Sequence, residues 1–328
     1  MDTAKVEVHP DYESLEIIPT TETQIKEGLF NKVTVAGDEN LKAENISKGT
    51  SIFGVEGTAN TTSLKITDSS YLFQNRARLD YMNEFLALCE NVTNMTNMFY
   101  YCDSLTELDL SNFDTSNVTG TGMYSLFSGC AKLETLNIKG FDTSGLTELR
   151  YVFSGCVRLT SIDVSSFNTS KVTNFYEMFK GCKSLTSLDV SNFDTSRAFN
   201  FTGMFRGCTG LTELDLSNFD MSKATSVSNI LYELTALEKL KSFKNLGKGY
   251  ATRAHNSSSL KLDLSTSTNL THESLMDVIN NLYDLNITYD VANGGTLYRQ
   301  ALVLGSTNLA KLTEEEIAIA TNKGWNVS

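Results

Sequence analysis

The stretch MFKGCKSLTSLDVSNFDTS at residues 178–196 returns in similar form four more times along the chain. Every copy carries one phenylalanine near its start and one cysteine three residues later. The copies are 26 residues apart, except for the first two, which are 28 apart because residues 120–125 contain two extra residues. A period between about 20 and 50 residues predicts a stacked repeat protein, because one such unit cannot bury its apolar face alone. The aligned pairs are Phe99 and Cys102, Phe127 and Cys130, Phe153 and Cys156, Phe179 and Cys182, and Phe205 and Cys208.

Each repeat predicts the same order of local structure. Apolar and polar residues alternate in segments such as residues 187–191, which predicts a short strand that pairs with its equivalent in the next repeat. The following SNFDTS is rich in turn-forming side chains. Val172, Phe175 and Met178 have the spacing of one helix face, which predicts a short helix on the strand layer. The expected fold is therefore an α/β repeat solenoid of the leucine-rich-repeat type, built from strand, turn and short helix. A glycine that precedes most cysteines is expected to end each helix, at Gly129, Gly155, Gly181 and Gly207.

Five of the six cysteines occupy one repeat position, and Cys89 lies outside that register. Equivalent positions do not pair evenly into disulfides, and the chain has no closely spaced cysteine pair of the kind that zinc sites use. Free cysteine is among the most buried residue types. We therefore expect a buried column of thiols, with one thiol in each repeat and no metal site, which suits folding in a reducing cytoplasm.

The register weakens toward both ends of the chain. Leu231, Leu234, Leu237 and Leu240 continue it as a degenerate sixth rung. In the C-terminal region, Thr313 and Glu316 predict a capping box at the start of a helix. The predicted domains are a small β-rich attachment module with hairpins (1–62), an N-terminal cap (63–92), leucine-rich repeats (93–241), and degenerate repeats with a C-terminal cap (242–328).

The composition narrows the classes of partner. The formal net charge of −12 disfavours a nucleic acid or an anionic membrane surface, which basic faces bind. No apolar run reaches the length of a membrane span, so we expect no membrane insertion. The first residues, MDTAKVEVHPDYES, lack the pattern of a secretory signal, so export by a signal peptide is not expected.

Catalytic motifs are weak throughout the chain. The segment from His272 to Ser274 could form part of a hydrolase triad, but Thr271 and Glu273 fit the start of a helix better. The glycines at residues 120–123 lack the lysine of a phosphate-binding loop. We therefore expect no enzyme activity, no catalytic residue and no cofactor. Four recurring acids could line a calcium or sugar site, although a solvated strand face is the favoured interpretation: Asp109, Asp163, Asp189 and Asp215.

A binding surface is easier to predict. Positions three before, two before and one after each phenylalanine vary between repeats, whereas the apolar positions do not. Tyrosine and arginine, which are favoured at recognition hot spots, occur there repeatedly. The alternative is that these exposed positions are simply unconstrained. The predicted binding stripe consists of Tyr100, Tyr124, Arg150, Tyr151, Tyr176 and Arg206.

The repeated strings, such as MFYYCDSLTELDLSNFDTSNVT at residues 98–119, resemble the BspA-like leucine-rich repeats. Those repeats occur in surface proteins of Firmicutes and mycoplasmas and in prophages of gut bacteria. The tail from residue 269 to residue 325 resembles the C-terminal cap of the same proteins. Residues 27–58 resemble a module that is common in tail and baseplate proteins of phages infecting Gram-positive bacteria.

These resemblances together imply a phage tail or baseplate protein in the virion, made in the host cytoplasm. Residues 1–62 would join it to other tail proteins, and the repeats would bind a host wall glycan or a surface protein. A homo-oligomer, such as a trimer, would suit a fibre. The alternatives are a bacterial cell-surface adhesin of the same repeat class and a purely structural baseplate component.

Overall fold

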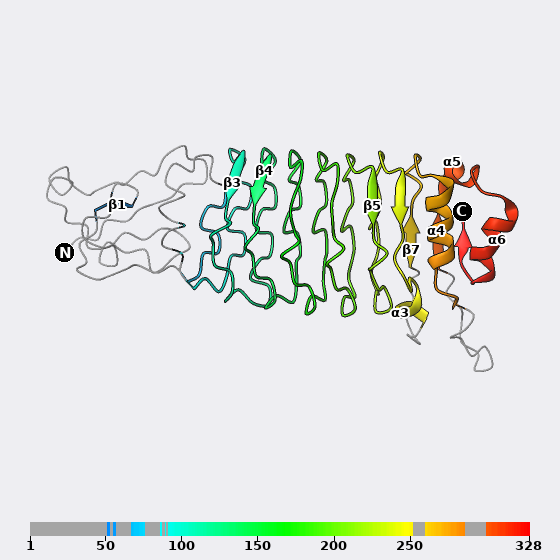
Figure 1. Ribbon diagram of the computed structural model, residues 1–328, viewed down its shortest axis with the longest axis horizontal. Helices are drawn as coiled ribbons and strands as arrows, with labels where there is room; N and C mark the ends of the chain where they lie inside the picture. The colour runs from blue at the N-terminus through cyan, green and yellow to red at the C-terminus, as the bar shows by residue number, and fades with distance from the viewer. Residues whose placement is uncertain are drawn as a thin grey trace.

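The computed structural model describes residues 51–52, 55–56, 67–75, 86, 89, 91–251, 260–285 and 300–328. The 26-residue units stack along one axis as successive rungs of an elongated solenoid (Figure 1). The repeat solenoid is therefore confirmed. Its predicted N-terminal module falls almost wholly outside the described residues. Only the two-residue strands β1 (Ser51–Ile52) and β2 (Val55–Glu56), which pair antiparallel, belong to that region.

The strands of the repeats are short and form no continuous sheet. Strand β3 (Glu107–Asp109) pairs in parallel with β4 (Thr135–Asn137), and β5 (Glu213–Asp215) pairs in parallel with β6 (Lys239–Lys241). Each has a buried central residue between two exposed ones, as the alternation predicts. The equivalent residues 161–163 and 187–189 of the two middle repeats keep this burial pattern but form no strand.

The predicted short helix of each repeat is wrong, because residues 91–247 contain no helix. The backbone instead adopts positive φ twice per repeat, two residues before and two residues after the phenylalanine, as at Tyr151 and Gly155. The Phe153 amide donates across to Met178 of the next rung at 2.9 Å, while the Cys156 amide donates back to the Phe153 carbonyl at 3.2 Å. Alternate amides thus bond between rungs, where a helix would bond within itself. Tight turns of about four residues reproduce the apolar spacing that favoured a helix.

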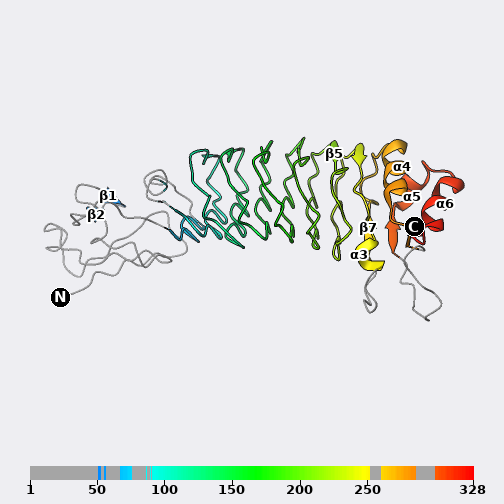
Figure 2. The same cartoon turned by 60° about the horizontal axis from the view of Figure 1, so that its bottom comes forward.

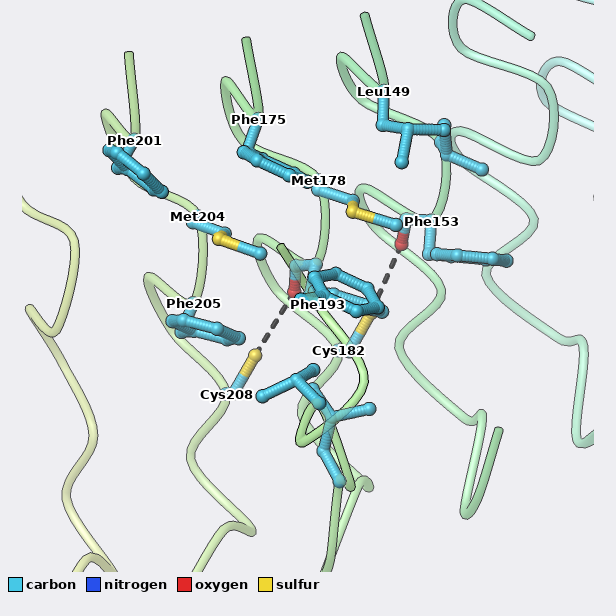
Figure 3. Close-up of a cluster of buried hydrophobic side chains, with 14 of the residues drawn as sticks. Leu149, Phe153, Phe175, Met178, Cys182, Phe193, Phe201, Met204, Phe205 and Cys208 are labelled. Carbon is cyan, nitrogen blue, oxygen red and sulfur yellow. Dashed lines mark hydrogen bonds between the residues drawn. The ribbon is translucent and has the colours of Figure 1, made fainter. Parts of the chain in front are cut away.

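Aligned phenylalanines form the centre of the core. The rings of Phe127, Phe153 and Phe179 are buried and nearly parallel, with centroids 5.8 Å and 5.4 Å apart. The ladder extends to Phe73 at one end and Phe205 at the other. Residues 67–75 therefore continue the stack by one rung before the first clear copy of the repeat. Figure 3 shows part of this core, where phenylalanine, methionine and cysteine of neighbouring rungs pack in successive rows.

The buried cysteine column is confirmed, and its thiols also connect the rungs. Cys182 Sγ donates to the Phe153 carbonyl at 3.0 Å, and Cys208 Sγ donates to the Phe179 carbonyl at 3.0 Å (Figure 3). Each such carbonyl therefore accepts the amide of its own cysteine and the thiol of the next one. The same thiol bond is made by Cys102, Cys130 and Cys156.

The ladder thiols are expected to be unreactive while the protein is folded. Burial raises the pKa of Cys208 to about 12, and burial with the neighbouring thiols raises the pKa of Cys156 and Cys182 well above the ordinary value. The reactive thiolate of these three cysteines is therefore scarce at neutral pH, and Cys102 and Cys130 are equally inaccessible because they are fully buried. Native protein should leave the five ladder thiols unmodified by a disulfide reagent, and denatured protein should expose all of them. Rapid labelling of these thiols without unfolding, resolved by peptide mass spectrometry, would contradict this arrangement.

Polar side chains close the corners of each rung. Aspartate and asparagine accept the amide two residues later, as Asp189 Oδ1 does from Ser191 at 2.9 Å. In the DTS segments, and in the equivalent NTS segment at residues 168–170, a buried threonine bonds twice to the next rung. Thr169 Oγ1 donates to the Asp194 carbonyl at 3.0 Å and accepts the Asp194 amide at 2.8 Å. Thr143 and Thr195 repeat this pair of bonds with their own neighbours.

Helices occur at the C-terminal end, where they close the stack (Figure 2). The helices are α3 (Lys248–Ala251), α4 (His272–Asn281), α5 (Gly305–Leu309) and α6 (Glu314–Asn322). A parallel sheet of β7 (Lys261–Asp263), β8 (Ala301–Val303) and β9 (Asn326–Val327) lies among them. Ser274 and Asp277 of α4 accept the amides of Leu240 and Ser242, which satisfies the outer edge of β6. The predicted capping box of Thr313 and Glu316 is confirmed. None of the described helices has the length and apolarity of a membrane span.

Candidate functional site

The predicted stripe lies on the turns that lead to the cysteine of each rung. In the rung of Phe179, these turns run from Asn174, which accepts the Tyr176 amide, to Cys182. One column holds the residues three before each phenylalanine, where Tyr124, Arg150 and Tyr176 follow one another in consecutive rungs. The Arg150 guanidinium lies 5.3 Å from the ring centroid of Tyr124 and 5.9 Å from that of Tyr176. The cation therefore sits between two aromatic rings, in the range where the ring quadrupole attracts it.

Tyr151 completes this arrangement from the neighbouring column. Its ring packs edge-on against Tyr124 at 5.6 Å and against Tyr176 at 5.0 Å, and it lies 5.9 Å from the Arg150 guanidinium. Burial and a hydrogen bond with Tyr176 raise the pKa of Tyr151 to about 12. Its phenol therefore stays a hydrogen-bond donor over the whole physiological range. All four side chains are partly exposed.

Two tyrosines of the first rung extend this group. Tyr100 and Tyr101 pack edge-on with centroids 4.5 Å apart, and Tyr101 is 49% exposed. Burial, with the nearby phenols of Tyr101, Tyr124 and Tyr151, raises the pKa of Tyr100. We call the following set the aromatic cluster: Tyr100, Tyr101, Tyr124, Arg150, Tyr151 and Tyr176.

The structure therefore brings four of the six predicted stripe residues into direct ring contact, and the phenols of Tyr124 and Tyr151 are near enough to raise the pKa of a fifth, Tyr100. Arg206 belongs to a different neighbourhood, where its guanidinium lies over the ring of Tyr232 at 5.6 Å and 3.4 Å from Glu233. In the described part of the chain, no ring contact or ion pair joins Arg206 to the aromatic cluster. Tyr101 was missed by sequence reasoning. Its signal was its place two residues after the phenylalanine, where the next four repeats have glycine.

The variable positions are not free of backbone constraint. The residue two before each phenylalanine adopts positive φ, which Asn97 and Gly203 accommodate easily. Tyr151 occupies the same position with φ of 59°, and a bulky side chain is uncommon there. Because this conformation recurs two residues before the phenylalanine in every clear repeat, it belongs to the turn and does not by itself mark a functional site.

Gly129 supports the edge of the cluster in two ways. Its φ is 79°, and an added Cβ would lie 2.9 Å from the ring of Tyr101. Gly129→Ala is therefore expected to cost about 1–2 kcal/mol through backbone strain and to push the Tyr101 ring off Tyr100. Gly181→Ala is the matched control, since it has the same strain at φ of 72° but no contact closer than 3.8 Å. Urea unfolding should show the loss from backbone strain in both variants and a further loss for Gly129→Ala from the displaced ring, while tyrosine fluorescence should change only for Gly129→Ala. Equal fluorescence in both would contradict the contact.

The other candidate residues are placed differently. Asp109, Asp163, Asp189 and Asp215 each accept the amide of the serine two residues later, which holds their corner turns. Hydrogen bonds from these serines hold the pKa of Asp109, Asp163 and Asp189 below the usual range. Within the described ranges, no three acidic, histidine or cysteine side chains are grouped to hold a metal ion.

The segment from His272 to Ser274 does not assemble a triad. His272 Nε2 lies 2.8 Å from Glu316 Oε1, whereas Ser274 Oγ bonds the backbone of β6. Thr271 accepts the Ser274 amide at 3.2 Å, as a helix cap does. The same region borders a hollow of about 540 Å³ that sequence reasoning missed. Both lysines that line the hollow are paired with acids of the preceding rung. The charged residues of the lining are largely acidic: Asp189, Glu213, Asp215, Lys239, Lys241, Glu273 and Asp277.

A family described as "Mycoplasma protein of unknown function, DUF285" matches the chain in three overlapping segments, at residues 44–122, 67–187 and 121–243. Together the segments run from residue 44 to residue 243, which is more than half of the 328 residues. The matched region contains every clear repeat and the whole aromatic cluster. Comparison with the curated proteins and with the solved structures gave no match.

Proposed function

The chain belongs to the DUF285 family, and we propose that it is a non-enzymatic recognition protein whose repeats present the aromatic cluster to a ligand on a cell surface. The aromatic cluster is the observation that carries this proposal. The buried phenylalanine and cysteine positions are the same in every clear repeat. The cluster occupies positions outside this core, and its tyrosines and arginine come from four consecutive rungs. Tyrosine and arginine at such positions are typical of recognition surfaces on repeat proteins.

Binding of the labelled full chain to intact Gram-positive cells tests this proposal. A variant with Tyr124, Tyr151 and Tyr176 all changed to alanine should lose binding, because three adjacent rings disappear. Tyr232→Ala is the matched control, since Tyr232 is a partly exposed tyrosine outside the cluster. Urea unfolding must show that both variants stay folded. Full binding by the folded triple variant would overturn the proposal.

The proposed location is the phage tail or baseplate, with residues 1–62 joining other tail proteins and a trimer as the proposed assembly. This part rests on the resemblance of residues 27–58 to tail and baseplate modules. Immunogold microscopy of particles and cells from an induced culture tests it, using antibody against residues 63–328. Gold at tail tips would support a location in the tail of the virion. Gold on the cell wall with bare particles would favour a bacterial surface adhesin instead.

A further inference from the structure

We infer that the aromatic cluster binds an uncharged, extended polysaccharide that runs along the stacking axis and places successive sugars on successive rungs. The inference rests on the proposed function and names the ligand class of the same site. It depends on the charge balance of the cluster, on the spacing of its rings and on the polarity of its side chains.

The charges at the cluster neutralise one another. Arg150 Nη1 lies 3.4 Å from Glu148 Oε2, and Lys180 Nζ lies 2.7 Å from Glu177 Oε2. The Arg150 guanidinium also lies over three rings, and Glu148 already neutralises its charge. The formal net charge of −12 repels an anionic polymer at long range. An uncharged ligand fits this balance best.

The rings are spaced along the stack. Tyr124, Tyr151 and Tyr176 come from three consecutive rungs, with neighbouring centroids 5.6 Å and 5.0 Å apart. One pyranose unit in an extended chain advances by a similar length. Because neighbouring rings are edge-on, a linear glycan aligned with the axis would meet a ring face and a ring edge in turn, with one ring per sugar. The tyrosines of the first rung lengthen the track. A ligand lying across the axis would meet only one or two rings.

The cluster combines apolar ring surface with phenol groups, and it contains no aliphatic anchor. Partly exposed tyrosine offers a face for the C–H side of a sugar and a hydroxyl for the sugar's own hydroxyls. Protein interfaces more often centre on anchors buried in desolvated pockets. The described residues with large exposed hydrophobic side chains are Tyr71, Tyr101 and Phe199, and only Tyr101 belongs to the cluster. These features favour a glycan over a protein surface.

Isolated Gram-positive cell walls provide the first test with the full chain. Periodate, which cleaves sugar diols, should abolish binding, while protease should leave it unchanged. Hydrofluoric acid cleaves phosphodiesters, which destroys anionic wall polymers and releases neutral glycans attached through such a linkage, so binding should persist in the stripped wall or in the released neutral glycan. Loss of binding after protease, or from both of these fractions, would overturn the glycan inference but leave surface recognition standing. Absence of binding to untreated walls and cells would overturn both.

Calorimetry with soluble probes gives the second test. Linear neutral hexasaccharides should bind, and an acidic hexasaccharide of similar length should bind at least about tenfold more weakly. Tyr124→Ala, Tyr151→Ala and Tyr176→Ala should each weaken binding about tenfold, while Tyr232→Ala should leave it unchanged. Disaccharides should bind much more weakly than hexasaccharides, since they reach fewer rungs. Preference for the acidic probe, or equal affinity for short and long probes, would contradict the inference.

Discussion

Replacement of Phe153 by alanine is expected to lower the free energy of unfolding by about 3–5 kcal/mol. Phe153 is fully buried, and its ring stacks between Phe127 and Phe179. Removing the ring leaves a cavity. The neighbouring rings cannot move in to fill it, because backbone hydrogen bonds between rungs fix the distance from one rung to the next. The carbonyl of residue 153, which accepts from Cys156 and Cys182, stays in place, so the loss measures ring packing.

Urea unfolding followed by circular dichroism measures this loss. Phe199→Ala is the matched control, since Phe199 is 43% exposed and should contribute less than about 1 kcal/mol. Repeat proteins couple mainly between neighbours, so the Phe153 variant should also broaden the transition. A loss below about 1 kcal/mol for Phe153→Ala would mean that the ladder does not hold the stack together.

Thr169→Val is expected to lower the free energy of unfolding by about 1–3 kcal/mol. Valine has nearly the same shape but removes both bonds between Thr169 Oγ1 and the Asp194 backbone. Because Thr169 is 1% exposed, water cannot replace its hydroxyl at that corner. The Asp194 amide and carbonyl then lose their partner in the preceding rung.

Thr173→Val is the control for this change. Thr173 Oγ1 makes a single bond at 3.2 Å to the Thr147 carbonyl in an exposed setting, where water can substitute. In urea unfolding, Thr173→Val should lower the free energy of unfolding by less than about 0.5 kcal/mol. Equal losses for the two variants would contradict a role for the buried threonine ladder.

The sequence predicted the stacking because one apolar code returns in five clear copies. The buried phenylalanines, cysteines and strand leucines could all be assigned from that code. The local backbone could not, because turns of about four residues give the same apolar spacing as one helix face. The left-handed positions occupied by Tyr151 and Glu177 carry no glycine to announce them.

The candidate site was predictable in part for a related reason. Variation against a constant core pointed to the positions of Tyr124, Arg150 and Tyr176, and stacking brings those positions together. Sequence pattern alone could not show that Arg206 lies apart from the aromatic cluster. Its partners Tyr232 and Glu233 belong to the sixth rung, where the repeat pattern is weak. The rings therefore had to be placed in space before one cluster could be distinguished from two neighbourhoods.

Hydroxyl-radical footprinting of the full chain, with and without cell-wall fragments, tests most directly whether the aromatic cluster is the recognition surface. The cluster tyrosines should lose reactivity when the fragments bind, while Tyr232 and Tyr283 outside the cluster should keep theirs. Protection confined to the acidic hollow beside α4, or bound fragments that leave the cluster tyrosines fully reactive, would contradict the account.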